Sequence, residues 1–135
     1  MILKAFESRQ REECYKDYAE TGRPRDYLVE RAKAELKARR HRHRYLPSSM
    51  FGEPAWDMLI ALYLAEEETR PETICSLIVG AGLPHATGLR WLHVMENHRL
   101  AIRQPHPSDK RVVQMELTEN GRRALDNYFA TIASA

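Results

Sequence analysis

The sequence predicts a mainly α-helical fold with one small β-hairpin, and three observations lead to that prediction. Apolar residues recur at helical spacing in several segments. Two short runs, Leu100–Arg103 and Val112–Leu117, are typical of strands, and a proline-rich loop joins them. Just before this hairpin, Gly80-Ala81-Gly82 separates two helical segments, as in helix-turn-helix units. The prediction is therefore a winged helix-turn-helix preceded by an N-terminal helical arm.

Length and composition fit one domain with an appended arm. The chain has 135 residues, 43% of them hydrophobic, which is enough for a core. We expect an N-terminal arm over residues 1–45, with a basic segment and a role in dimerisation, and a winged-helix domain over residues 46–135. No apolar run approaches the roughly 20 residues that cross a bilayer. Without a membrane span, a signal segment or a cysteine framework, we expect a cytoplasmic protein.

The arm is expected to contain two helices. Residues 2–20 look helical but weakly amphipathic, and a second helix is expected over about residues 27–44, with Asp26 as its N-cap. The apolar stripe of that helix is Leu28, Ala32 and Leu36. So narrow a stripe predicts little burial against its own domain, and it suits a helix that packs on a partner subunit or lies across a larger body.

The second helix ends in a basic run, Arg39-Arg40-His41-Arg42-His43-Arg44. Residues 1–45 carry 13 Lys and Arg against 8 Asp and Glu, whereas residues 46–135 carry 8 against 11. The run can be a solvated helix end favoured by the helix dipole, or a contact with phosphates or another acidic partner. Histidines two positions apart point to different sides of a helix, so we predict no metal or cofactor site. The candidate phosphate contacts are Arg39, Arg40, Arg42 and Arg44.

Two segments should build the centre of the core and the first helix of the motif. Pro54 is expected to open a central helix that runs to about Glu67. Its apolar face comprises Trp56, Leu59, Ile60, Tyr63 and Leu64. Thr73 should cap a short helix through Val79, within which Cys75 is expected to be a small packed residue.

The helix expected over about residues 84–98 is a candidate recognition helix. Its core-facing positions are Gly88, Trp91, Leu92 and Met95. The opposite face is small at its tip and carries donors that can reach bases or phosphates. The candidate contacts there are His85, Thr87, Arg90 and His93, and Arg90 is preferred for a base because arginine is the commonest partner of guanine. Taken alone, such a face is usually just the solvent-exposed side of a surface helix.

The hairpin supplies the more specific signal. Two prolines stiffen its loop, over about residues 104–111, and Asp109 lies close enough to Arg111 to hold the guanidinium in one direction. A preoriented arginine at a hairpin tip suits the minor groove or the DNA backbone. Arg103 and Lys110 add positive charge nearby.

A last helix follows the second strand. Thr118 is expected to cap it, and it should run from Glu119 to about Ile132. Its apolar face comprises Leu125, Tyr128, Phe129 and Ile132.

A set of residues spread over these segments resembles one family. The set comprises Leu77-Ile78, Gly82-Leu83, Thr87, Trp91-Leu92, Met95-Glu96, Leu100, Arg103, Asp109-Lys110-Arg111, Leu117-Thr118 and Gly121. Its most specific mark is Asp-x-Arg followed at this distance by Leu-Thr-x-x-Gly. The pattern, over about residues 54–125, is similar to the winged helix of the multiple-antibiotic-resistance regulator (MarR) family. The resemblance implies that Asp109 and Arg111 form the wing pair and that Thr87 and Arg90 lie on the recognition helix.

The chain departs from that family at two places. It has Arg99 where the family usually has glycine, at the corner between helix and strand. The family dimerises through N- and C-terminal helices, and here only 17 residues follow Thr118. The N-terminal helices are therefore expected to carry more of a homodimer. The sequence does not indicate a small-molecule effector.

These features predict a sequence-specific transcriptional regulator that binds double-stranded DNA. The recognition helix is expected in the major groove, and the wing on the minor groove or backbone. The alternative is a winged-helix interaction module that modulates another regulator without binding DNA itself, which the small net charge of +2 favours. No arrangement of nucleophile and base, nucleotide loop or paired-carboxylate motif is visible, so we do not expect an enzyme.

Overall fold

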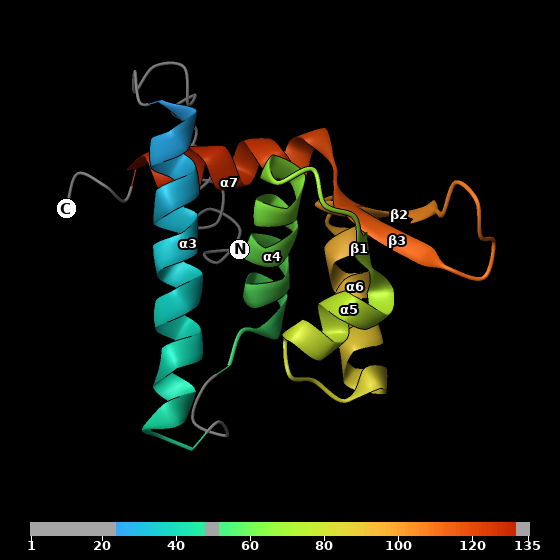
Figure 1. Ribbon diagram of the computed structural model, residues 1–135, viewed down its shortest axis with the longest axis horizontal. Helices are drawn as coiled ribbons and strands as arrows, with labels where there is room; N and C mark the ends of the chain where they lie inside the picture. Colours follow the sequence, from blue (N-terminus) through green and yellow to red (C-terminus); the bar gives the residue numbers. More distant parts are fainter. Residues whose placement is uncertain (1–23, 48–51, 132–135) are drawn as a thin grey trace, which may run out of the picture.

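A computed structural model describes residues 24–47 and 52–131, which contain α-helices and a small antiparallel sheet (Figure 1). The helices are α3 (Arg25–His41, continued by the 3-10 turn η1, Arg42–Arg44), α4 (Pro54–Glu67), α5 (Ile74–Gly80), α6 (His85–Asn97) and α7 (Glu119–Thr131). The strands are β1 (Glu72–Thr73), β2 (Ala101–Pro105) and β3 (Val113–Leu117), in the order β1-β3-β2. The mainly α-helical fold with a hairpin is confirmed. The helix expected over residues 2–20 lies outside the described residues.

The hairpin of β2 and β3 pairs Ala101 with Leu117 at its base and Pro105 with Val113 at its tip. Val113, Met115 and Leu117 alternate along β3; Met115 and Leu117 are buried, whereas Val113 at the tip is 37% exposed. Strand β1 was not predicted, because two residues are too short to show a strand pattern. It pairs with the middle of β3 and ties the start of α5 to the hairpin.

Helix α4 is the centre of the core, as expected, and Pro54 is its first residue. Its burial is broader than the predicted face. Met58 and Leu62 are buried beside Ile60 and Tyr63, whereas Trp56 is only half-buried. The reason is that α3, α5, α6, α7 and β3 contact this helix from different sides. None of the helices in the described parts of the chain is long and apolar enough to cross a membrane.

Helix α3 corrects two expectations. Leu28, Ala32 and Leu36 are buried in the same hydrophobic cluster as α4 and α7, so the stripe is not left for another body to cover. The N-cap is Pro24, and Asp26 lies inside the first turn. The first backbone N–H groups of a helix have no partner within it, which is why proline is tolerated at this end.

Polar contacts hold both ends of α3. At its start, Arg25 pairs with Glu67 of α4 and with Asp126 of α7, and it lies over the Tyr63 ring. The Tyr63 hydroxyl donates to Asp126 at 2.6 Å. At the other end, Arg39 pairs with Asp57 and with Glu53 beside the start of α4.

The Tyr63 contact predicts sensitivity to alkali. Burial raises the pKa of the Tyr63 hydroxyl far above its usual range, and the hydrogen bond to Asp126 acts in the same direction. A raised folded-state pKa contributes stability below the unfolded value, about 10, and this stability is lost as the pH rises. Tyr63→Phe should flatten that alkaline fall in unfolding free energy and cost about 1–2 kcal/mol at neutral pH, because Asp126 loses a donor. Urea unfolding over a pH series measures both effects. The control is Tyr45→Phe, at a side chain that is 73% exposed; an alkaline profile of Tyr63→Phe that matched the wild type would contradict the assignment.

The corner between α6 and β2 is closed by a left-handed residue. Arg99 has φ 58°. Its N–H donates to the Glu96 carbonyl at 2.9 Å, and the Leu100 N–H donates to the Met95 carbonyl at 3.0 Å. This is the Schellman pattern, in which glycine is the usual residue at the left-handed position. The chain therefore keeps the corner and accepts the strain of a side chain there.

Arg99→Gly should raise the free energy of unfolding by about 1 kcal/mol, because glycine adopts positive φ without the steric cost of a Cβ. Denaturant unfolding followed by circular dichroism measures this change. His98, with φ −83°, is the matched control; His98→Gly should instead lower stability by about 0.5–1 kcal/mol. A loss of stability in Arg99→Gly would contradict the strained corner.

Two side chains are more exposed than expected. Cys75 is exposed on α5, because Leu77 and Ile78 form the buried side of this short helix. Tyr128, expected on the apolar face of α7, is 39% exposed and packs edge-on against Trp56 with ring centroids 5.0 Å apart.

Candidate nucleic-acid interface

The two helices of the predicted motif are joined as the sequence indicated. Thr73 caps α5 in a capping box with Ser76, each side chain accepting from the other's backbone N–H at 3.0 Å. The turn after α5 uses Gly82 at φ 68°, and α6 begins at His85 after Pro84. Both helix ends follow from residues that stabilise them locally.

Gly88 allows α6 to lie directly against α5. A Cβ at this position would come within 2.6 Å of the Ile78 side chain. Leu92 and Met95 are buried on the same side of α6. The close packing leaves the other side of α6 facing outward.

The exposed side of α6 carries the residues that were predicted to contact DNA. His85, Arg90 and His93 are exposed, and Thr87 is half-buried. No hydrogen bond or ion pair within the described residues ties down Arg90. One apolar residue, Val94, shares this side at 39% exposure. The arrangement is a row of donors and small side chains of the kind that reads base edges.

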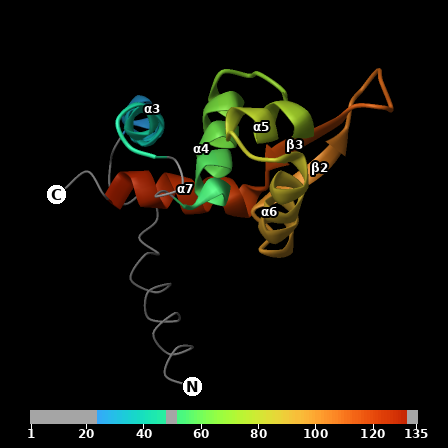
Figure 2. The ribbon, with the colours of Figure 1, turned by 90° about the horizontal axis from the view of Figure 1, so that it is seen from below.

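The wing, residues 106–112 between β2 and β3, projects from the body of the protein (Figures 1 and 2). The Asp109 carboxylate accepts from the Arg111 backbone N–H at 3.0 Å and from its Nε at 3.2 Å and Nη2 at 3.3 Å. The hydrogen bonds from Arg111 lower the pKa of Asp109. The Arg111 side chain is nevertheless 91% exposed, and Lys110 is exposed beside it.

The Thr118-x-x-Gly121 pattern fastens α7 to the corner between α6 and β2. The Thr118 hydroxyl accepts from the Gly121 N–H at 3.0 Å, which caps α7, and donates to the Arg99 carbonyl at 2.6 Å. A Cβ on Gly121 would lie 2.1 Å from the Leu100 carbonyl oxygen. Glycine is therefore required for this approach of helix and corner.

Arg103 forms an ion pair within the protein. Its Nε donates to Glu96 at 2.7 Å, linking β2 to α6, and its side chain is 34% exposed. Arg39 is likewise engaged, with a side chain only 14% exposed between Asp57 and Glu53. A contact of either arginine with DNA stays a prediction, and it requires these ion pairs to open.

Arg40, Arg42 and Arg44 are exposed at the end of α3 and in η1. Helix α3 and the wing lie at opposite ends of the long axis of the molecule (Figure 1). In the view from below, α6 and the wing share the far side from α3 (Figure 2). One copy of the chain therefore brings the predicted residues of α6 and the wing together, but not those of the basic run.

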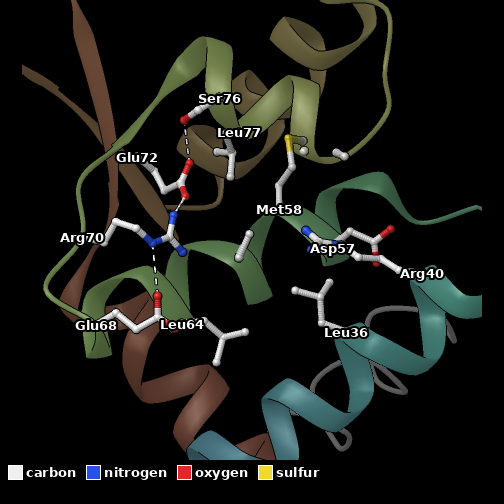
Figure 3. Close-up of a pocket in the computed structure, with 13 residues that line it drawn as sticks. Leu36, Arg40, Asp57, Met58, Leu64, Glu68, Arg70, Glu72, Ser76 and Leu77 are labelled. Atoms are coloured by element: carbon white, nitrogen blue, oxygen red, sulfur yellow. Dashed lines mark hydrogen bonds and ion pairs between the residues drawn. The ribbon is translucent and has the colours of Figure 1, made fainter.

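A cavity of about 300 Å³ separates α3 from α5 (Figure 3). Its apolar lining comes from three elements, with Leu36 of α3, Leu64 of α4 and Leu77 of α5. Its polar lining includes Arg70, which pairs with Glu68 and Glu72, and Ser76, which donates to Glu72 at 2.6 Å. No group of three or more potential metal ligands occurs within residues 24–47 and 52–131.

His106 is a wing residue that the sequence-based prediction missed. Its ring Nδ1 lies 3.1 Å from the Ser108 backbone nitrogen and 3.0 Å from that of Asp109. The sequence signal for this role is the position of His106, a possible side-chain acceptor, two and three residues before Ser108 and Asp109. Asn and Asp side chains bind backbone N–H groups at a similar spacing in turns.

No protein-family model and no curated protein matches the sequence. Solved structures match the fold. MepR of S. aureus, solved in a complex with DNA, has a TM-score of 0.56 at 18% identity, over 80% of this chain and 84% of that one. The heme sensor protein PefR of Streptococcus agalactiae, solved with heme, has a TM-score of 0.54 at 18% identity, over 98% and 74%.

A mutant form of MepR from a multidrug-resistant S. aureus clinical isolate has a TM-score of 0.51 at 20% identity. The match covers 58% of this chain and 54% of the MepR mutant, so the chain spans about half the length of that protein. At such low identities these likenesses define the fold. The chain has the winged helix-turn-helix fold of MarR-like regulators, and the resemblance seen in the sequence is confirmed at that level.

Proposed function

We propose that the protein is a sequence-specific transcriptional regulator that binds double-stranded DNA and is not an enzyme. The observation that carries the proposal is the wing tip, where Asp109 directs an Arg111 side chain that is 91% exposed. An arginine whose direction is set before binding loses less conformational entropy on contact. The likeness of the fold to that of MepR, which was solved with DNA, supports the same conclusion.

In this proposal α6 enters the major groove and the wing contacts the minor groove or the backbone. Arg90 reads a base, and His85, Thr87 and His93 contact bases or phosphates beside it. Lys110 and Arg111 supply charge at the wing. Phosphates are contacted by Arg103, Arg39, Arg40, Arg42 and Arg44.

We also propose a homodimer, formed through the N-terminal helices. Two copies would present two α6 helices to half-sites about one turn of DNA apart. The placement of α3 and the wing at opposite ends of the molecule supports this arrangement (Figure 1). If two copies pair through α3, the two wings lie at the outer ends of the dimer. Sedimentation equilibrium of the full chain tests it; a monomer at the concentration that saturates DNA would contradict the dimer.

A salt series tests DNA binding. Fluorescence anisotropy with a labelled duplex selected from a random library should show affinity falling steeply between about 50 and 200 mM salt, as counterions are released from phosphates. Absence of binding to any duplex would contradict the proposal and favour the alternative, a winged-helix module that engages another regulator.

Arg111→Ala should weaken binding to selected and random duplexes alike and reduce the salt slope by about one, because one phosphate contact is lost. The melting temperature should stay nearly unchanged, since the side chain is exposed. Arg123→Ala, at an exposed arginine on α7, is the control for loss of charge alone. Equal affinities of the Arg111 variant and the wild type would contradict the wing assignment.

A further inference from the structure

His106 joins both sides of the wing. Its backbone N–H donates to the Val112 carbonyl at 3.1 Å, directly beyond the last pair of the β2–β3 ladder. Its ring Nδ1 accepts from the backbone N–H groups of Ser108 and Asp109, at 3.1 and 3.0 Å, and lies 3.3 Å from the Ser108 hydroxyl. The imidazole thus serves as the acceptor for two backbone N–H groups of the loop.

The contacts of His106 and Asp109 form a series that ends at Arg111. The Asp109 N–H is bound by His106, and the Asp109 carbonyl accepts from the Val112 N–H at 3.1 Å. The backbone of Asp109 is therefore held from two directions. Its carboxylate in turn binds the backbone and guanidinium of Arg111. Hydrogen bonds therefore connect the His106 ring to the Arg111 side chain through Asp109.

We propose that His106 is a positioning residue for DNA binding: its ring fixes the backbone at Ser108 and Asp109 and thereby directs Arg111. The inference rests on the proposed DNA-binding function. His106 itself need not touch DNA. Its contribution is to order the wing before the encounter, so that less entropy is lost when Arg111 meets its site.

Two variants separate the hydrogen-bonding role from other roles. In His106→Asn the side-chain oxygen can accept from N–H groups two and three residues on, as in an Asx turn. In His106→Ala no acceptor remains. Amide hydrogen exchange and ¹⁵N relaxation of Ser108, Asp109 and Arg111, measured on the full chain without DNA, should show an ordered wing in the wild type and the Asn variant. The Ala variant should be mobile; wing amides in the Ala variant that matched the wild type would overturn the proposal.

Anisotropy with the selected duplex completes the test. At neutral pH, His106→Ala should bind about fivefold more weakly, as the loss of roughly one net hydrogen bond predicts, and His106→Asn should bind nearly as the wild type does. Equal affinity of an Ala variant with a mobile wing would overturn the positioning role. Failure of the wild type to bind any duplex would instead contradict the proposed function, and the amide measurements would still decide whether His106 orders the wing.

Discussion

Gly121→Ala is expected to lower the free energy of unfolding by about 3 kcal/mol or more, because overpacking against backbone leaves no side chain to move aside. The new Cβ would lie 2.1 Å from the Leu100 carbonyl oxygen and 3.0 Å from the carbonyl carbon. Helix α7 would have to move away from the corner and strain the hydrogen bond from the Thr118 N–H to that same oxygen, now 3.1 Å. Urea unfolding followed by circular dichroism measures the loss.

Gly80→Ala is the matched control. No atom lies within 4 Å of a Cβ built at Gly80, and its φ is not positive. Alanine there should leave stability unchanged or raise it by up to about 1 kcal/mol. If both alanine variants unfolded like the wild type, α7 would not lie against the Leu100 corner.

Arg90→Ala is expected to weaken binding to the selected duplex by about 1–3 kcal/mol, or roughly 5- to 150-fold, and to weaken binding to random DNA much less. The side chain is exposed, so stability should hardly change. Anisotropy with both duplexes under one salt condition measures the two losses.

Arg90→Lys keeps the charge but removes the planar fork that pairs with guanine. If Arg90 reads a base, the lysine variant should lose specificity nearly as far as the alanine variant does. Equal losses on selected and random DNA in Arg90→Ala, with lysine restoring them, would instead make Arg90 a phosphate contact.

Sequence patterns were sufficient for helices α5, α6 and α7 and for the hairpin, because local residues specify the ends of these helices. Thr73, Gly82 and Thr118 stabilise helix termini in the predicted way. The patterns failed where the tertiary surroundings decide. The stripe of α3 looked too narrow for burial, yet α4 and α7 cover it. Strand β1 exists only because β3 offers it a partner.

The candidate interface was predictable in part. The link between Asp109 and Arg111 follows from a spacing of two residues, and the structure contains it. The partners of Arg39 and Arg103 could not be foreseen, because Asp57 and Glu53 lie 14 to 18 positions from Arg39 and Glu96 lies on another element from Arg103. Arg39, whose side chain is only 14% exposed, would have to break its ion pairs to reach a phosphate, whereas Arg111 is 91% exposed although it is paired with Asp109.

The pinning of α3 at both ends has a mechanical consequence. Arg25 fastens α3 to α7, and Arg39 fastens it to the start of α4. Helix α7 is in turn fixed to the corner between α6 and β2 through Thr118 and Gly121. A force applied to α3 by a partner subunit would pass along α7 to the common root of α6 and the wing. The two elements proposed to contact DNA would then move together, so a second copy would change the distance between the two α6–wing units without changing the shape of either.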